Sequence, residues 1–305
     1  MKLSRRHLLA TGLASPFLAT SLFAQRAFAE AHMTPALPTH RSFALGEFKV
    51  TTLLAGSTPR EDPHSIFGLN VSDEEFSRVS KEAFLPEDMA QFFFTPTLVD
   101  TGEERILFDT GLNAGGITHA LAAAGYTPSD ITHVVLTHMH GDHIGGLMQD
   151  GAPTFENAAY VTGQVEYDHW AGAANDGFEG NVRPLADKMT FLSDGGSVRS
   201  GITAMLAAGH TPGHMAYMLE SGGKQLLLMA DTANHYVYSL AHPDWEVRFD
   251  MDKAAAAATR RRLFDMASAD QIPLIGYHMP FPGLGYVETR GEGYHFVPHS
   301  YQLMG

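Results

Sequence analysis

Short apolar runs alternate with turn-forming residues along most of the chain after residue 40. Apolar runs bounded by Gly, Pro, Asn or Asp are typical of strands, and apolar residues spaced three or four apart are typical of helices. The pattern predicts strands over residues 48–54, 92–99, 105–108, 131–136, 159–162, 202–206, 215–219, 225–229 and 273–277. It predicts helices over residues 72–84, 116–124, 164–170 and 252–266. This order of elements favours two sheets packed together with helices outside.

The hairpin, the last strand and one helix face are specific expectations of this pattern. Residues 92–99 and 105–108 are expected to pair as a hairpin around Gly102. Residues 273–277 are expected to form the last strand, and the run Arg260-Arg261-Arg262 to form a solvated basic helix face. No internal repeat or linker divides the chain after residue 40, which predicts a single domain over residues 30–305.

The first 29 residues have the features of an export signal. Arg5 and Arg6 lie in a basic start, residues 8–24 are uncharged and apolar, and Ala-Phe-Ala at residues 27–29 is a small-x-small cleavage site. The segment around the two arginines resembles the twin-arginine signal, which carries folded proteins across the bacterial inner membrane. We therefore expect a periplasmic protein that keeps no membrane anchor after processing.

Composition narrows the chemistry. The chain has 305 residues, a formal net charge of −14, 17 His and no Cys. The lack of Cys excludes disulfides, thiolate zinc sites, iron–sulfur clusters and a Cys nucleophile. The acidic balance argues against a nucleic-acid partner, because phosphate binding needs a basic surface. The abundance of His directs attention to metal binding.

Four side chains that can bind a metal lie within six residues, in His138-Met139-His140-Gly141-Asp142-His143. The segment follows the apolar run 131–136, so it begins where a buried strand ends. His138 and His140 point the same way in an extended chain and can bind one ion together. Asp142 and His143 fall where the chain turns toward a helix and can face a second ion. Imidazole and carboxylate suit Zn²⁺ and similar cations.

Three more apolar strand candidates end in a side chain of the same kind. His210 follows the strand predicted over 202–206, Asp231 follows 225–229, and His278 follows 273–277. Strand ends that meet at one sheet edge are rigid places on which to build a site. Each residue alone is a weak signal, and together with the first motif they predict one metal centre.

These residues resemble the metallo-β-lactamase superfamily over about residues 95–282, and Phe108-Asp109-Thr110-Gly111 matches its strand-end Asp-Thr-Gly. The resemblance implies an α+β four-layer αββα sandwich. It also implies that His214 and Asp109 support the site without binding metal. The implied ligands are His138, His140 and His210 for the first metal, Asp142, His143 and His278 for the second, and Asp231 as the bridge between them.

Among the branches of the family, the chain is most similar to methyl parathion hydrolases and N-acyl-homoserine lactonases. The segments that carry the similarity to methyl parathion hydrolases are Ala124-Gly125-Tyr126, Leu136–His140, His235 and Pro280-Phe281-Pro282-Gly283. Asp231 is present and Cys is absent, which disfavours a β-lactamase. Many lactonases place a catalytic Tyr three residues after the bridging Asp, where this chain has Asn234. The candidates to replace that Tyr are Tyr236, Tyr238 and Tyr277.

The resemblance implies a dinuclear zinc hydrolase with two Zn²⁺ per chain. A hydroxide held between the ions would attack a neutral ester, lactone or phosphotriester, and Asp142 would pass a proton to the leaving group. The alternatives are a mononuclear iron-dependent oxidoreductase similar to persulfide dioxygenases, a β-lactamase, and a metal-binding protein without catalysis. The expected partner is a small-molecule substrate, and a homodimer is compatible with the sequence. The candidates for an apolar pocket wall are Phe92, Phe93, Phe94, Phe281 and Leu284.

Overall fold

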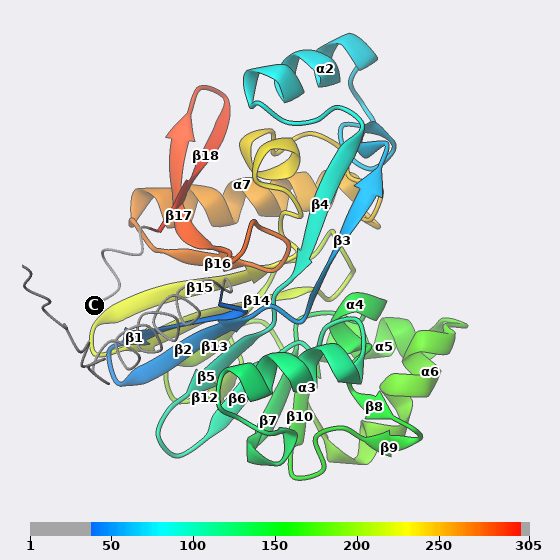
Figure 1. Cartoon of the computed structure of the whole chain (residues 1–305), viewed down its shortest axis with the longest axis vertical. Coiled ribbons are helices and arrows are strands. Elements are labelled where there is room, and N and C mark those ends of the chain that lie inside the picture. Colours follow the sequence, from blue (N-terminus) through cyan, green and yellow to red (C-terminus); the bar gives the residue numbers. More distant parts are fainter. Residues whose placement is uncertain (1–37, 300–305) are drawn as a thin grey trace, which may run out of the picture. The chain divides into compact units, whose positions relative to one another are not determined.

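A computed structural model of the chain describes residues 38–299 (Figure 1). The signal expected over residues 1–29 lies outside the described residues. Within residues 38–299, no helix has the length and apolar character that a membrane crossing requires.

The first sheet has seven strands and brings several carboxyl ends to one edge. Parallel pairing joins β6 to β7, β7 to β10 and β10 to β11, so these four strands end on the same side. The sheet order is β1 (His40–Leu45), β2 (Phe48–Leu53), β5 (Thr97–Asp100), β6 (Arg105–Phe108), β7 (His133–Leu136), β10 (Ala159–Gly163) and β11 (Met189–Leu192).

The second sheet also has seven strands and holds the later part of the chain. Its one parallel pair is β15 with β16, and its other neighbours are antiparallel. The order is β12 (Ser197–Arg199), β13 (Ile202–Leu206), β14 (Met215–Ser221), β15 (Lys224–Ala230), β16 (Leu274–Gly276), β17 (Leu284–Arg290) and β18 (Gly293–Pro298).

Helices and two small hairpins complete the described part of the chain. The hairpins pair β3 (Gly56–Glu61) with β4 (Met89–Phe94) and β8 (Met148–Gln149) with β9 (Ala152–Pro153). The α-helices are α2 (Asp73–Glu82), α3 (Ala114–Ala123), α4 (Gly141–Ile144), α5 (Gln164–Gly172), α6 (Asp176–Asn181) and α7 (Lys253–Ala269). Short 3₁₀ turns occur at Pro63–Ser65, Pro128–Asp130 and Arg183–Lys188, and a π-helical turn, η4, at Tyr236–Ala241.

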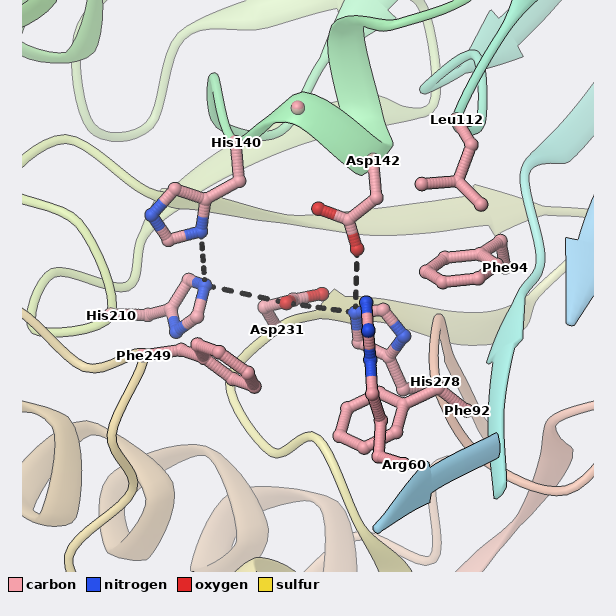
Figure 2. A pocket seen from close by; sticks show the side chains of 11 residues that line it. Arg60, Phe92, Phe94, Leu112, His140, Asp142, His210, Asp231, Phe249 and His278 are labelled. Carbon is pink, nitrogen blue, oxygen red and sulfur yellow. Dashed lines mark hydrogen bonds and ion pairs between the residues drawn. The ribbon is translucent and has the colours of Figure 1, made fainter. Parts of the chain in front are cut away.

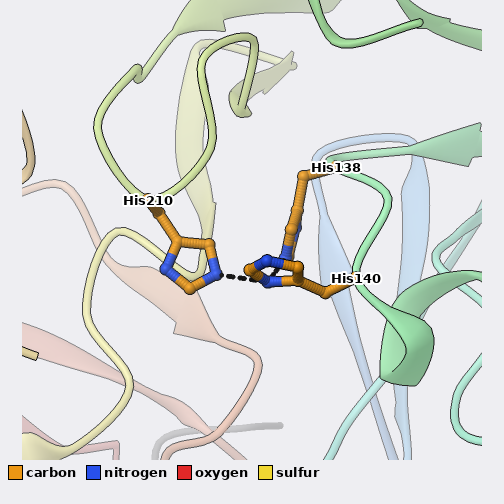
Figure 3. A group of neighbouring side chains, drawn as sticks. All are labelled: His138, His140 and His210. Atoms are coloured by element: carbon orange, nitrogen blue, oxygen red, sulfur yellow. Dashed lines mark hydrogen bonds between the residues drawn. The ribbon is translucent and has the colours of Figure 1, made fainter. Parts of the chain in front are cut away.

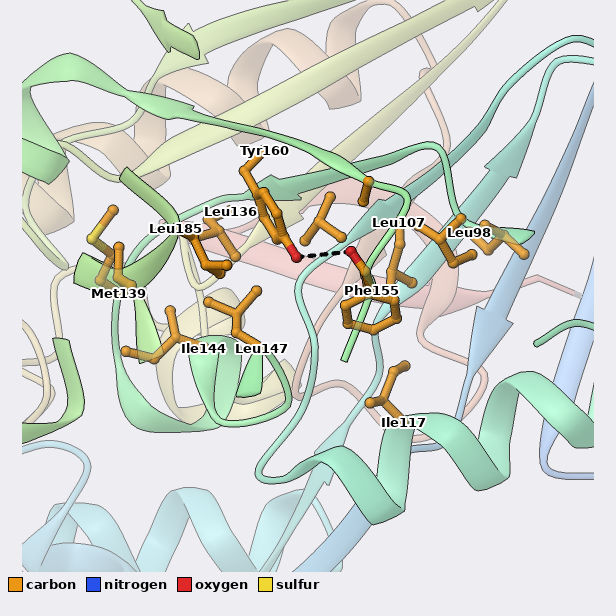
Figure 4. Packing of buried hydrophobic residues seen from close by; sticks show 14 of the residues in the cluster. Leu98, Leu107, Ile117, Leu136, Met139, Ile144, Leu147, Phe155, Tyr160 and Leu185 are labelled. Carbon is orange, nitrogen blue, oxygen red and sulfur yellow. Dashed lines mark hydrogen bonds between the residues drawn. The ribbon is translucent and has the colours of Figure 1, made fainter. Parts of the chain in front are cut away.

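Three apolar clusters show how these elements stack. The middle cluster lies between the sheets and joins Val99 and Val135 of the first sheet to Tyr217 and Leu228 of the second. A second cluster packs α3 and its neighbours against the outer face of the first sheet, where Phe155 lies between Ile117 and Leu107 (Figure 4). A third packs α7 against the second sheet. Helix, sheet, sheet and helix therefore form four layers, which confirms the expected αββα sandwich.

Two of the expectations for strands are wrong. The run 92–99 is two strands, because Pro96 lacks the N–H that a continuous ladder needs. β4 pairs with β3 in a separate hairpin, and only β5 pairs with β6 around Gly102. The strand at 274–276 is also not the last, since β17 and β18 follow it. Both segments combine Gly with aromatic and β-branched residues such as Tyr286, Val287 and Tyr294, which is typical of strands.

Candidate metal centre

The metal-binding residue types predicted from the sequence come together where strands of both sheets end. His138 and His140 follow β7 of the first sheet, and His210 lies four residues beyond the end of β13. Asp231 directly follows β15, and His278 follows β16. His140, Asp142, His210, Asp231 and His278 line one pocket (Figure 2). Side chains that follow separate strands therefore lie together in space.

The backbone is unusual at two of these strand ends. Asp109, just after β6, has φ of 61°, and Ala230, the last residue of β15, has φ of 44°. Residues other than Gly seldom adopt this left-handed conformation, which costs on the order of 1 kcal/mol or more. Asp109 itself contacts His143, and Ala230 directly precedes Asp231. The strained backbone therefore occurs where polar side chains enter the site.

Three imidazoles form one half of the centre, called here the histidine trio: His138, His140 and His210. His140 Nδ1 lies 3.1 Å from His138 Nε2 and 2.9 Å from His210 Nε2 (Figure 3). Nitrogens bound to zinc at about 2.0–2.1 Å in a tetrahedral arrangement lie about 3.4 Å apart. The trio therefore fits a single cation of the size and ligand preference of zinc.

The other half, called here the carboxylate half, contains Asp142, His143 and His278. His278 Nε2 lies 3.3 Å from Asp142 Oδ2 and 3.1 Å from Asp231 Oδ2. The same Asp231 oxygen lies 3.3 Å from His210 Nε2, so this carboxylate contacts both halves. His143 Nε2 and Asp231 Oδ1 lie 3.3 Å apart and are both buried without a hydrogen bond. Buried polar atoms without partners are rare, and this pair fits a cation as the missing partner.

The imidazoles of the two halves differ in the direction of their pKa shifts. Burial, with neighbouring imidazoles, lowers the pKa of His138 well below its usual value and that of His140 to about 3. Burial also opposes protonation of His143 and His278, but the Asp231 carboxylate overcomes it and raises the pKa of both. His138 and His140 are thus held neutral, which is the form that binds metals, whereas the protonated form of His143 and His278 is favoured.

Hydrogen bonds at Nδ1 orient the imidazoles of His143, His278 and His210, whose Nε2 atoms face the centre. Asp109 Oδ2 accepts from His143 Nδ1 at 2.8 Å, and the same carboxylate accepts from the backbone and hydroxyl of Thr137. His278 Nδ1 donates to the carbonyl oxygen of Phe93 at 2.8 Å. His210 Nδ1 donates to Asp250 Oδ1 at 3.0 Å. Such partners fix ring orientation and tautomer in metal sites.

The expectation that Arg260 belongs to a solvated face is wrong. Its side chain is fully buried, donates to Asp250 Oδ2 at 2.8 Å, and also donates to the carbonyl oxygens of Pro243 and Trp245. Successive helical residues point about 100° apart, so three adjacent Arg cannot share one environment. Arg260 donates to Asp250, and Asp250 in turn orients the His210 ring. The local sequence around Arg260 and Asp250 gives no sign of this pairing.

His214 and Asn234 contact Asp231 rather than completing a metal group. His214 Nε2 accepts from the Asp231 backbone N–H at 3.1 Å, which fits the supporting role expected for this residue. Asn234 Nδ2 donates to Asp231 Oδ2 at 2.8 Å. The groups of side chains close enough to share an ion in residues 38–299 draw on His138, His140, Asp142, His143, His210, Asp231 and His278.

Of the three tyrosines considered as replacements for a catalytic Tyr, only Tyr277 lies at the centre. Its ring stacks on His143 at 3.9 Å between centroids, and its hydroxyl donates to the Asp142 carbonyl oxygen at 2.6 Å. Tyr238 instead bonds Ser80 of α2, and Tyr236 lines a different cavity. Because the Tyr277 hydroxyl is engaged with the backbone, its observed contact is structural.

The pocket above the centre has a volume of about 350 Å³ and aromatic walls. Phe92, Phe94 and Phe249 line it with Leu112, and Arg60 lies among them (Figure 2). Two of the predicted wall residues, Phe281 and Leu284, line a separate cavity of about 480 Å³ instead. Phe93 also does not line the pocket, since alternate residues of β4 point to opposite faces.

Comparison with known proteins agrees with this geometry. A chain described as AidC, a dizinc quorum-quenching lactonase, superposes with a TM-score of 0.79 and 27% identity, covering 86% of this chain and 98% of that one. The hydrolase AbOPH of the beta-lactamase superfamily gives a TM-score of 0.81 at 22% identity, which shows the shared fold.

Curated relatives match over shorter segments. An atrochrysone carboxyl ACP thioesterase of Aspergillus fumigatus is 32% identical over 127 residues, covering 40% of this chain and 26% of the relative. The N-acyl homoserine lactonase AttM of Agrobacterium fabrum is 29% identical over 144 residues, covering 43% and 50%. The chain thus spans between a quarter and half of the length of these curated relatives.

One family covers the region that builds the centre. The family described as the metallo-beta-lactamase superfamily matches residues 95–273, more than half of the chain. The match includes both strained strand ends, the histidine trio and Asp231, and the four-layer fold confirms it independently. This chain belongs to the metallo-beta-lactamase superfamily of metal-dependent hydrolases.

Proposed function

We propose that this protein is a dinuclear zinc hydrolase that cleaves a neutral ester or lactone. The observation that carries the proposal is the position of Asp231, whose Oδ2 lies 3.3 Å from the trio at His210 and 3.1 Å from the carboxylate half at His278. A carboxylate placed between two groups of nitrogen and oxygen donors suits a bridge between two cations.

The residues assigned to each cation follow from the two halves. The trio would hold the first, and Asp142, His143 and His278 would hold the second, with Asp231 shared. All donors are imidazole nitrogens or carboxylate oxygens, which suit zinc. When bound, two such cations lower the pKa of a water molecule and polarise the substrate carbonyl.

Asp142 is the group best placed to move a proton. Its side chain is 24% exposed, whereas that of Asp231 is 3% exposed, so Asp142 is the more accessible of the two carboxylates that line the pocket. A carboxylate within reach of the leaving oxygen can first accept the proton of the attacking water and then deliver it as the bond breaks. The Tyr277 hydroxyl donates a hydrogen bond to the carbonyl oxygen of Asp142 and so restrains the backbone of this residue.

The pocket walls define the substrate class. Phe92, Phe94 and Phe249 offer apolar surface for an acyl chain. These apolar walls suit an uncharged substrate such as an ester or lactone. Arg60 carries no ion pair or side-chain hydrogen bond to other residues of the segment 38–299 and points toward the pocket (Figure 2). Its guanidinium would donate to an acceptor oxygen of the substrate away from the scissile bond.

A substrate panel combined with elemental analysis tests the proposal. We expect about two zinc per chain and turnover of a lactone or aryl ester above that of a thioester, a phosphotriester or a β-lactam. One iron per chain without zinc, in protein purified without added metal, would favour the mononuclear oxidoreductase. Preferred hydrolysis of a β-lactam would overturn the substrate class.

We also propose that the enzyme acts in the periplasm after loss of residues 1–29, which the sequence of that segment supports. Replacing Arg5 and Arg6 together by Lys is expected to stop export by the twin-arginine route. Amino-terminal sequencing of exported protein should begin near Glu30, and undiminished export of the double variant would refute this route.

A further inference from the structure

Glu166 is a buried acidic residue that the proposed chemistry does not use. It is the third residue of α5, its side chain is inaccessible to solvent, and it does not line the pocket. A buried charge is costly unless hydrogen bonds satisfy it. The partners of its two oxygens therefore indicate what the residue does.

The first oxygen holds the loop that carries two imidazoles of the trio. Glu166 Oε1 accepts from the backbone N–H of Met139 at 2.9 Å and from Trp170 Nε1 at 2.7 Å. Met139 lies between His138 and His140, so this bond fixes the backbone from which both imidazoles project. Trp170 also places its ring edge against His140, with centroids 5.8 Å apart.

The second oxygen holds the loop that carries the third imidazole. Glu166 Oε2 accepts from Thr211 Oγ1 at 2.7 Å and from the backbone N–H of Gly213 at 3.0 Å. Thr211 directly follows His210. A Cβ at Gly213 would lie 2.1 Å from the Glu166 backbone nitrogen, so this loop packs directly on the start of α5.

All four contacts suit an acceptor with two equivalent oxygens. Three of the partners are N–H groups that can only donate, and the Thr211 hydroxyl can donate as well. A Gln at this position would have nearly the same size but would present an NH₂ group to one of the two loops. The substitution therefore breaks one side of the connection with little change in packing.

We propose that Glu166 is a positioning residue that sets the separation of the two trio loops, and thereby the affinity of the trio for a divalent cation. The first loop belongs to the first sheet and the second loop to the second sheet, and one carboxylate spans both. The inference rests on the proposed function only in that the trio binds a cation.

Titration of metal-free protein with Co²⁺ tests this role, because cobalt reports both affinity and geometry through its visible absorption. Glu166→Gln is expected to weaken binding of the first cobalt equivalent about 10- to 100-fold and to shift its absorption bands. Asp168→Asn is the matched control, since Asp168 lies two residues further along α5 and is exposed, and within residues 38–299 its side chain accepts a hydrogen bond from Gln164 alone. The control should bind cobalt as the wild type does.

Two outcomes would overturn the inference. The first is a folded Glu166→Gln protein with wild-type cobalt affinity and spectrum, even if its melting temperature falls. If this variant does not fold, Thr211→Val removes a single donor, and unchanged cobalt binding in that variant is the second. A wild-type chain that binds no cobalt would instead refute the proposed metal set, which distinguishes the two failures.

Discussion

The two halves of the candidate centre lie side by side and are built on different principles. The histidine trio offers only imidazoles, and burial keeps the pKa of His138 and His140 far below its usual value. The carboxylate half surrounds its imidazoles with acidic groups, and these raise the pKa of His143 and His278. Two imidazoles of the trio are therefore kept neutral, whereas protonation of the two imidazoles in the carboxylate half is favoured.

This difference indicates that different physical features would determine the cation affinity of each half. The trio depends on geometry, which Asp250 fixes behind His210. The carboxylate half depends on charge, because anionic oxygens attract a cation strongly at short range, but its imidazoles must release protons before they bind. Substitutions should therefore affect the two halves differently, and the shared residue should matter most.

Removing the charge of Asp231 is expected to have the largest effect. Asp231→Asn keeps the shape of the side chain and leaves β15 intact, so the protein should fold. Metal content should fall, chiefly in the carboxylate half, and kcat/KM near neutral pH should drop on the order of 10³-fold. The pH–rate profile should move to higher pH. Two metals per chain with an unchanged profile would show that Asp231 is not the bridge.

A pair of His substitutions separates ligands from supports within the trio. His210→Ala removes a trio nitrogen and should weaken zinc binding at least about 100-fold. His214→Ala removes only an acceptor for the Asp231 backbone N–H and should keep most of the metal. Elemental analysis after dialysis against a chelator measures both variants. The reverse ranking would exchange the two assignments.

His235 tests, away from the centre, whether burial alone keeps an imidazole neutral. Burial lowers the pKa of His235 to about 3, and its Nδ1 accepts from the backbone N–H groups of Val237 and Tyr238. Because the unfolded state binds a proton below about pH 6.5 and the folded state does not, stability is lost as the pH falls through that value.

The matched variant is His235→Asn, which keeps an acceptor but cannot be protonated. The free energy of unfolding of the wild type should fall by about 2–3 kcal/mol more than that of the variant between pH 6.5 and 4.5. Urea unfolding of both metal-free proteins at each pH gives this difference directly. Parallel stability curves would mean that His235 is protonated in the folded state.

Arg60 should give the smallest effect, because it lies in the pocket wall rather than in either half. Arg60→Ala should raise KM for a lactone with an amide-linked acyl chain about tenfold and leave kcat within about twofold. Arg60→Lys keeps the charge and should lose less. A fall in kcat with unchanged KM would place Arg60 in the reaction itself and not in substrate binding.

The ligand-type residues were predictable because each follows an apolar run. His138, His210, Asp231 and His278 all stand at or just beyond strand ends, and strand ends of a layered fold meet at one edge. The break between two strands at Pro96 was also predictable, since proline interrupts a ladder of backbone hydrogen bonds. The apolar residues on both sides of Pro96 nevertheless favour one continuous strand. Local pattern thus carried most of the fold and the whole set of candidate ligands.

The supports behind those ligands could not be predicted in the same way. Asp250 lies 40 positions from His210, and Glu166 lies 27 and 45 positions from Met139 and Thr211. Nothing in the sequence near any of these residues indicates the pairing, because the fold alone brings them together. The burial of Arg260 is unpredictable for the same reason, since the carbonyl oxygens of Pro243 and Trp245 that accept its hydrogen bonds lie on a distant segment.

The arrangement of the trio across both sheets has a mechanical consequence. His138 and His140 extend from the first sheet and His210 from the second, so a cation bound by all three would act as a crosslink between two stretches of chain some 70 residues apart. In a protein without cysteine, such a crosslink would restrict the chain as a disulfide does in other proteins. Loss of the cation would then remove this link and make the junction of the two sheets easier to open.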